Sequence, residues 1–228
     1  PPAQHMDKLP LYEYAVVLRP WLWFLTRSAD CRVFQNLKVP QIVATILDKY
    51  PGRFEQDLAD EDYRPWEYCV QYRETDFNFV SRLLEQEGAF YFFAHEEGSH
   101  TLKLVDQHGP KSKTRHKLVY ASGERAARLE TELVRHWRVA HEVQPGAYAI
   151  KDFDFKKPTA PQLSVVKQPY EHDFGKLEVF DYPGEFDAPA EGDGYVRLRL
   201  DELRAQHELM RAECNVRALR VGDVFELA

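Results

Sequence analysis

Histidine side chains are the residues of this sequence best suited to bind a metal or to transfer protons. Four of them, His95, His100, His108 and His116, lie close together in the middle of the chain. A zinc site usually begins with two ligands separated by only a few residues. These histidines form neither an HxH nor an HxxxH pair. We therefore interpret them as residues of solvated loops and predict no metal site.

Two carboxylates, Asp152 and Asp154, alternate with Phe153 and Phe155 in the segment KDFDFKK. Paired carboxylates can perform acid–base catalysis, but in glycosidases the pair flanks a cleft and comes from separate elements. Alternation instead favours one polar face of a strand. No serine lies in a GxSxG motif, and no glycine-rich phosphate-binding loop is present. The sequence therefore predicts no catalytic residue and no cofactor.

The cysteines and the overall charge exclude several other functions. Cys31, Cys69 and Cys214 form no CxxC pair, which indicates buried free thiols in a reducing compartment. The 30 basic and 37 acidic residues give a net charge of −7, which argues against a general nucleic-acid binder. No apolar run approaches the roughly 18 residues of a membrane span. The N-terminal residues lack the features of a signal peptide. Both ends look arbitrary, and we expect the chain to be a fragment.

The first fifty residues suggest strands followed by a helix. Alternation from Tyr12 to Leu18 predicts a strand, and the segment Trp21–Leu25 predicts a second extended piece. Pro40 is suited to the first turn of a helix, where its missing N–H is not needed. The helix would end at Pro51-Gly52. Its expected buried stripe consists of Ile42, Val43, Ile46, Leu47 and Tyr50.

The segment from Arg64 to Phe93 predicts a strand, a helix and a second strand. Alternation places Trp66, Tyr68, Val70 and Tyr72 on the buried face of the first strand, opposite Cys69 and Gln71. Thr75 is a suitable helix N-cap, and Gly88 suits the position just after the helix. The helix has an apolar face of Phe77, Val80, Leu83 and Leu84, extended by Phe79. Segment 89–93 is apolar on both faces and is expected to be buried or at an interface. The core candidates are Trp66, Tyr68, Phe77, Val80, Leu84, Phe90, Phe92 and, farther along the chain, Trp137.

The remainder of the chain predicts short strands and one helix. The expected strands cover 101–105, 117–120, 132–143, 148–155 and 177–182, a spacing typical of a barrel or sandwich. Further strands are expected at 214–219 and 224–227. Segment 191–194 is interpreted as a flexible turn before the helix. The stripe of this candidate interface helix is Val196, Leu200, Leu203, His207 and Met210, with His207 as a satisfied core or interface histidine.

Two long segments carry a specific resemblance to a known family. LRPWLWFLTRSADCRVFQNLKVPQIV (18–43) and YRPWEYCVQYRETDFNFVSRLLEQEGAFYFF (63–93) resemble the VgrG spike-hub proteins of type VI secretion systems and the related tail-hub (late control D) proteins of contractile phages. Later segments such as VQPGAYAIKDFDFKKP (143–158) and LEVFDYPGEF (177–186) match in order. The resemblance implies an α+β fold, with antiparallel, barrel-like tube domains and an inserted α/β subdomain. It implies a remnant of the first tube domain at 1–27, the insertion at 28–97 and a second tube domain at 98–228, without the OB-fold and spike that follow.

The same resemblance implies a structural function. Such a hub adapts a trimeric spike to the hexameric inner-tube protein Hcp, for contractile injection of effectors. The implied partners are two further copies in the full-length protein, Hcp, baseplate components, and effectors or adaptors, without nucleic acid. The implied location is the bacterial cytoplasm during assembly, followed by secretion or delivery into a target cell. Two alternatives stay open: a hub-associated enzyme such as a cell-wall hydrolase, and an effector-binding module that uses an exposed strand edge.

Overall fold

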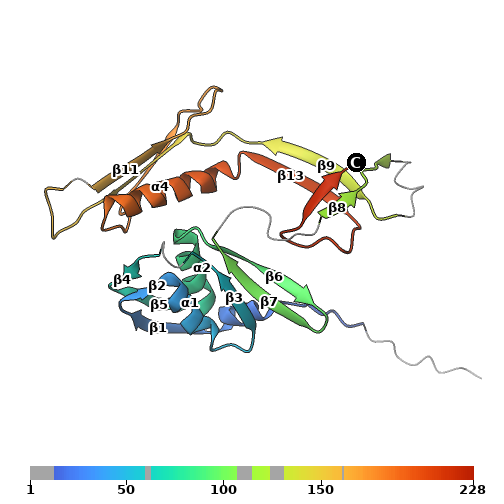
Figure 1. Cartoon of the computed structure of the whole chain (residues 1–228), viewed down its shortest axis with the longest axis horizontal. Coiled ribbons are helices and arrows are strands. Elements are labelled where there is room, and N and C mark those ends of the chain that lie inside the picture. The colour runs from blue at the N-terminus through green and yellow to red at the C-terminus, as the bar shows by residue number, and fades with distance from the viewer. Residues whose placement is uncertain (1–12, 60–62, 107–114, 124–130, 161) are drawn as a thin grey trace, which may run out of the picture.

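The computed structural model describes residues 13–59, 63–106, 115–123, 131–160 and 162–228. They form two lobes that lie one above the other in Figure 1. The N-terminal lobe (13–106) contains η1 to β7, and the C-terminal lobe (115–228) contains β8 to β14. The predicted α+β class is confirmed, with many short strands and few helices. The described strands form six small sheets, none of which closes into a barrel.

The N-terminal lobe combines two α-helices with three small sheets. Its elements are η1 (Trp21–Arg27), β1 (Ala29–Phe34), β2 (Leu37–Lys38), α1 (Val39–Leu47), β3 (Arg53–Asp57), β4 (Pro65–Trp66), β5 (Cys69–Thr75), α2 (Asp76–Gln86), β6 (Phe90–Glu96) and β7 (Ser99–Val105). Strands β1 and β5 pair antiparallel, as do β2 and β4. In the third sheet, of order β3-β7-β6, β3 runs parallel to β7 and β6 antiparallel to it. The expected boundary at 97/98 falls inside the β6–β7 hairpin, because β7 completes this sheet.

Both helices of this lobe begin where the sequence predicts. In α1 the Gln41 side chain accepts the backbone N–H of Lys38 at 2.9 Å, and Pro40 occupies the first turn. In α2 the Thr75 hydroxyl accepts the N–H of Asn78 at 3.1 Å. Gly88 follows α2 with φ +70°, the left-handed conformation that a helix-terminating glycine supplies. Helix α1 ends at Leu47, so the part-buried Tyr50 lies beyond it.

The lobe's apolar core is centred on α2. Phe79 is completely buried and stacks on the ring of Phe34, with ring centroids 5.6 Å apart. Val80 and Leu84 also lie in this core, whereas Phe77 is only partly buried at its margin. The buried face of α2 is therefore centred on Phe79 and not on Phe77, because α2 packs against η1, α1 and β5 together.

A polar network is enclosed beside this core. The carboxylate of Asp76 accepts hydrogen bonds from Arg32 (3.0 Å), Gln71 (2.8 Å) and the hydroxyl of Tyr50 (2.7 Å). Gln71 and Asp76 are almost wholly buried, and burial together with Asp76 raises the pKa of Tyr50. Buried polar groups need such partners, so the network fixes which face of β5 points inward.

The network explains an error in the predicted phase of β5. Cys69 and Gln71 point inward, and Tyr68 and Tyr72 lie outside, 59% and 64% exposed. The prediction assigned the aromatic residues to the core because they are apolar. The strand is instead oriented by the hydrogen bonds of Gln71, and Tyr68 is not a core residue.

The first residues of the lobe also differ from the prediction. Residues 13–20 have no regular structure, and Tyr12 lies outside the described residues. The segment predicted as extended is the 3₁₀-helix η1, whose Trp21, Leu22 and Leu25 are buried. Their spacing of three and four residues places them on one helical face. The strand prediction was wrong because this face packs on α2.

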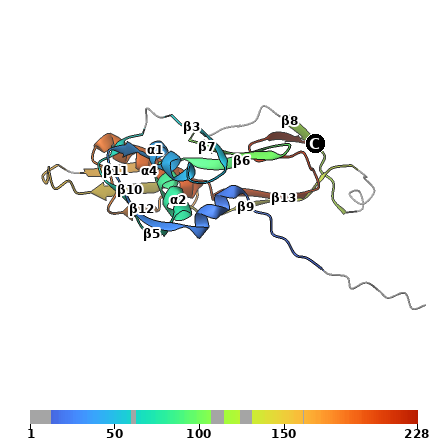
Figure 2. The same cartoon turned by 90° about the horizontal axis from the view of Figure 1, so that it is seen from below.

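The C-terminal lobe is elongated. Its elements are β8 (Arg115–Leu118), β9 (Val134–His141), β10 (Ala147–Asp152), β11 (Gln162–Lys167), β12 (Glu178–Asp181), α4 (Pro189–Arg204), β13 (Glu208–Cys214) and β14 (Val224–Leu227). Figure 2 shows the sheet of order β11-β10-β12 at one end and β8 near the other. Strands β9 and β13 pair antiparallel with each other in the part between these two ends. Strand β8 pairs parallel with β14. Helix α4 packs on β10 and β11, with a core of Tyr148, Ile150, Phe186, Tyr195, Val196 and Leu200.

Helix α4 is shifted relative to the prediction. Glu191 accepts the N–H of Asp187 (3.0 Å) and of Ala188 (3.3 Å), and this cap starts the helix at Pro189. Segment 191–194 is thus helical, not a flexible turn. A Cβ on Gly192 would lie 2.6 Å from the Ser164 hydroxyl, so glycine allows the helix to approach β11 closely. The helix ends at Arg204.

Several other predictions for this lobe were correct in type but not in extent. Strand β10 ends at Asp152 instead of Phe155, and the predicted strand 214–219 is replaced by β13, which ends at Cys214. Strand β14 is confirmed as predicted. The thiols of Cys31 and Cys214 are exposed and only Cys69 is buried, so the prediction of three buried cysteines was wrong.

Candidate functional site

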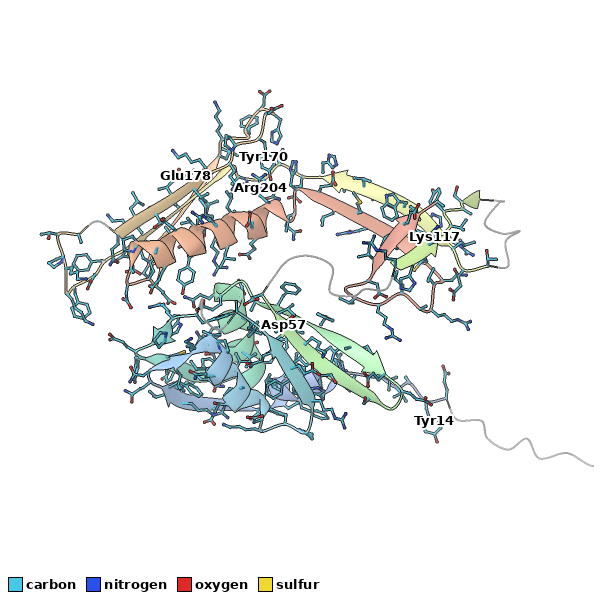
Figure 3. The ribbon with its side chains drawn as sticks, viewed as in Figure 1. Tyr14, Asp57, Lys117, Tyr170, Glu178 and Arg204 are labelled. Carbon is cyan, nitrogen blue, oxygen red and sulfur yellow. The ribbon has the colours of Figure 1, made fainter. Side chains whose placement is uncertain are left out.

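The outer face of the β11-β10-β12 sheet presents apolar side chains to solvent. Leu163 and Phe180 are 54% and 59% exposed, and Val165 is also exposed. The register places Val165 and Phe180 on either side of Ala149, on one face. Helix α4 covers the other face and lies between this sheet and the N-terminal lobe, so the lobe does not shield the outer face. Glu178 marks this outward side in Figure 3.

Two further faces carry exposed apolar side chains. On the β1–β5 sheet, Val33 and Tyr72 point outward, and Tyr68, just before β5, is also exposed. On the β9–β13 ribbon, Val139 and Met210 lie opposite each other in register and are both about half exposed. Contiguous exposed apolar surface typically marks a protein–protein contact. We name the outer face of the β11-β10-β12 sheet, formed by Leu163, Val165 and Phe180, the outer apolar face.

The predicted core residues divide into three groups. Val80 and Leu84 are buried. Trp66, Phe77, Phe92 and Trp137 are partly buried; Trp137 contacts the ring of Phe225, with centroids 6.2 Å apart. Tyr68 and Phe90 are exposed instead, Phe90 because β6 is an edge strand and its outer face is not covered by the core.

The predicted stripe of the interface helix is split among three elements. Val196 and Leu200 are buried within their own lobe, and Leu203 packs at its margin. His207 lies in the turn after α4, where its Nδ1 bonds the carbonyl of Glu142 at 2.8 Å. Met210 lies in β13. The helix therefore does not present this stripe as one free surface.

The aromatic surroundings of His207 form a local cluster at the end of α4. Its ring lies 4.3 Å from that of Tyr170, which also packs under the guanidinium of Arg204 at 4.7 Å. Tyr170 and Arg204 lie close together near the top of the C-terminal lobe in Figure 3. His141 and His172 lie about 6 Å from His207, ring centre to ring centre. The cluster packs the loop before β12 against the turn that follows α4.

The other candidate residues for chemistry have structural contacts. His95, His100 and His116 lie on strands, so their interpretation as loop residues was wrong; His108 lies outside the described residues. His116 Nε2 is 2.8 Å from Asp223, and His100 accepts the N–H of Trp21. Within the described ranges, no group of three or more histidine, cysteine or acidic residues could hold a metal.

The two carboxylates of the KDFDFKK segment have separate local roles. Asp152 accepts the N–H groups of Phe153 (2.6 Å) and Phe186 (3.3 Å). Asp154 accepts the N–H of Lys156 at 2.7 Å. Both carboxylates thus fix turns of the backbone. They also both line a cavity of about 250 Å³, where Arg64, Trp66 and Tyr68 of the N-terminal lobe face them.

Two further cavities are lined by residues of both lobes. The larger, about 790 Å³, is lined by Asp57 and Phe92 from the first lobe and by His116 and Arg220 from the second. Asp57 lies at the side of its lobe that faces the other in Figure 3. The smaller, about 460 Å³, is lined by Tyr63, Arg64, Glu87, Asp106, Glu191 and Tyr195.

Sequence reasoning missed the residues of the smaller cavity. Burial raises the pKa of Glu87, an effect that Trp66, Arg64 and Tyr195 oppose, and it raises the pKa of Tyr195 to about 12. Arg64, Glu87 and Tyr195 are widely separated in the chain, so no spacing motif could have indicated that they meet.

Comparison with known proteins gives a consistent result. The family model for the phage tail baseplate hub (GPD) matches residues 3–228. The chain is 40% identical over 216 residues to the type VI secretion system spike protein VgrG1b of Pseudomonas aeruginosa, covering 94% of this chain and 29% of that protein. It is 40% identical over 219 residues to VgrG1a of the same strain, covering 34% of it. It is 31% identical to the actin cross-linking toxin VgrG1 of Vibrio cholerae, covering 20% of it. The chain thus spans about a third or less of these curated relatives.

Solved structures show a similar fold. An E. coli component of the type VI secretion system, c3393, superposes with a TM-score of 0.60 at 20% identity, over 91% of this chain and 43% of that one. That protein is described as structurally similar to the T4 bacteriophage tail proteins gp27 and gp5. A 43 kDa tail protein of prophage MuSo2 from Shewanella oneidensis superposes with a TM-score of 0.50 at 14% identity, over 78% and 50% of the two chains. No helix in the described part of this chain has the length and apolar character needed to span a bilayer.

Proposed function

Because the chain belongs to the phage tail baseplate hub family, we propose that it forms the hub part of a type VI secretion spike. In this proposal it acts as a structural component of a contractile injection machine and carries out no catalysis itself. The relatives named as spike proteins support this proposal over nearly the whole chain. The relative named as an actin cross-linking toxin is matched over a fifth of its length, and we propose that the matched part is its hub.

The outer apolar face is the observation that carries the proposal. Leu163 and Phe180 are more than half exposed although they lie on regular strands. A monomer gains nothing from apolar side chains in water, whereas an assembly buries them and gains roughly 25 cal/mol for each Å² removed from water. Ligand pockets also form between domains, but Arg64, Glu87 and Tyr195 of the smaller cavity already bond one another or the 185–191 segment. The face therefore favours assembly.

The partners and the location follow from the same proposal. We propose a homotrimer in the full-length protein, docking onto the hexameric tube protein Hcp, and contacts with baseplate components and with effectors or adaptors. The hub would assemble in the bacterial cytoplasm and then be secreted or delivered into a target cell. In the terms of this family, we propose residues 1–27 as a remnant of the first tube domain and residues 28–97 as the inserted α/β subdomain, whose sheet β7 completes. Residues 98–228 are then the second tube domain.

A charge on the outer apolar face tests the assembly function. In Phe180→Glu, self-association of the chain should weaken about tenfold or more, because a carboxylate resists transfer into an apolar contact. Sedimentation velocity over a range of concentrations measures the association constant. Phe174→Glu is the matched control, because Phe174 is also exposed but lies in a loop outside this face. Equal association constants for Phe180→Glu and the unmodified chain would show that the outer apolar face takes no part in self-association.

A further inference from the structure

The two lobes have separate apolar cores. The main core of the N-terminal lobe contains only residues from 21 to 104, and the core around α4 contains only residues from 148 to 203. An interface without a shared apolar core usually allows two bodies to move relative to each other. What holds these lobes together must therefore be sought among the polar contacts between them.

The contacts between the lobes are mainly hydrogen bonds and ion pairs. Gln86 donates to the Glu185 carboxylate at 3.2 Å, Arg199 donates to Glu85 at 3.3 Å, and Arg220 donates to the carbonyl of His95 at 3.3 Å. One apolar approach accompanies them, where Leu198 of α4 lies over Gly88. Most of these groups are exposed, and exposed ion pairs contribute little.

Arg64 makes the most extensive of these contacts. Its guanidinium donates to the Asp187 carboxylate at 2.9 Å and to the backbone carbonyl of Glu185, and its Nε lies 3.7 Å from Glu191. The side chain is only 16% exposed. It also stacks over the Trp66 ring at 4.5 Å. One side chain of the N-terminal lobe thus holds the whole segment that leads into α4.

Glu87 and Tyr195 join the lobes beside Arg64. The Tyr195 hydroxyl of α4 donates to Glu87, just after α2, at 3.4 Å. Both residues and Arg64 line the smaller cavity of about 460 Å³. The cavity leaves room for the groups to separate, whereas a packed apolar contact would not.

We propose that Arg64, Glu87 and Tyr195 form a latch that holds the two lobes closed and that can open while both lobes stay folded. Opening breaks the bonds of Arg64 to the 185–191 segment and separates Tyr195 from Glu87. The two apolar cores stay intact, because neither extends across the interface. The hub would then change the spacing of its lobes without changing their internal structure.

Closure of the latch should depend on pH through Glu87. Burial raises the pKa of this carboxyl above its ordinary value of 4.5, and Trp66, Arg64 and Tyr195 oppose that effect. A raised carboxyl pKa means that the closed state holds the proton more tightly than the open state. Protonation of Glu87 therefore favours the closed state fully at pH values below the ordinary carboxyl pKa. This stabilisation is lost as the pH rises through the raised pKa of the closed state. The titratable or charged groups around the latch are Arg64, Glu85, Asp106, Glu185, Asp187, Glu191, Tyr195 and Arg199.

The native cysteines allow a direct test of the latch. Cys31 in β1 and Cys214 in β13 are exposed and lie in different lobes. Cys69 is buried, and burial raises the pKa of its thiol, so a thiol-directed spin label should react at the two exposed sites. Electron–electron double resonance then measures the distance between the lobes. The unmodified chain should give one narrow distance distribution.

Removal of the Arg64 charge should open the latch. In Arg64→Met the ratio of closed to open molecules should fall about tenfold, the effect of losing a charge-assisted hydrogen bond, and a longer distance should appear. Arg27→Met is the matched control, because Arg27 bonds Thr26 at 3.0 Å and lies over the Trp23 ring, both inside the N-terminal lobe. Tyr195→Phe should give a smaller change in the same direction. Circular dichroism verifies that each variant is folded.

The pH dependence provides an independent measurement on the same labelled protein. The closed population of the unmodified chain should rise as the pH falls from neutral toward 4.5, the ordinary carboxyl pKa, and in Glu87→Gln this rise should be lost. Asp48→Asn, at an exposed position of the N-terminal lobe just after α1, should retain it. A single unchanged distance in Arg64→Met, or a rise that persists in Glu87→Gln, would overturn the latch.

Discussion

Replacing Phe79 by alanine is expected to lower the free energy of unfolding of the N-terminal lobe by about 3–5 kcal/mol. The Phe79 ring is completely buried and stacks on Phe34. Its removal leaves a cavity among α2, η1 and α1, where the surrounding elements can collapse only in part. Chemical denaturation followed by circular dichroism measures the change.

Phe77 provides the matched control for Phe79. Both phenylalanines lie in α2, but Phe77 is only partly buried at the margin of the core. We expect Phe77→Ala to cost roughly 1–2 kcal/mol, because less apolar surface returns to water. Equal costs for the two variants would show that the core is not centred on Phe79.

The second large effect is expected at the buried carboxylate of Asp76. In Asp76→Ala, Arg32, Gln71 and Tyr50 lose their common acceptor, and Arg32 becomes a poorly solvated charge without its buried partner. Breaking one side of a buried ion pair typically costs 3–5 kcal/mol, and we expect about this loss of stability here. The denaturation midpoint of the purified variant measures it.

The same arginine supplies the control for this variant. Arg32 also pairs with Asp30 at 2.7 Å, but the Asp30 side chain is 47% exposed. We therefore expect Asp30→Ala to leave the midpoint close to that of the unmodified chain. In Asp76→Ala combined with Arg32→Met, part of the lost stability should return, because the unpaired charge is gone. A double variant as unstable as the sum of the two single variants would contradict the proposed coupling.

Local signals predicted the helices of the N-terminal lobe well. Thr75 and Gly88 bound α2, and Pro40 opens α1, because caps act within a few residues along the chain. The inward face of β5 was not predictable in this way. It depends on Gln71 reaching Asp76 and Arg32, and Arg32 lies on a different strand.

The candidate site shows the same distinction between local and distant information. The alternation in the segment 64–93 placed Tyr68 and Tyr72 on the buried face of a strand, but both side chains face outward. The predicted helix extended too far because the helical spacing of its stripe continues through His207 and Met210. In the structure α4 ends at Arg204, and the chain then turns into β13. Arg64 and Tyr195 meet only because the two lobes do, which no local pattern encodes.

The parallel pairing of β8 with β14 has a consequence for synthesis of the chain on the ribosome. Residues 115–118 pair with residues 224–227, so this part of the C-terminal lobe cannot form until residue 227 has emerged. Every element of the N-terminal lobe lies within the first 105 residues and can fold earlier. Contacts between such distant segments form slowly. We therefore expect the nascent N-terminal lobe to be complete, with its Glu87 and Arg64 already in place, before the second lobe folds against it.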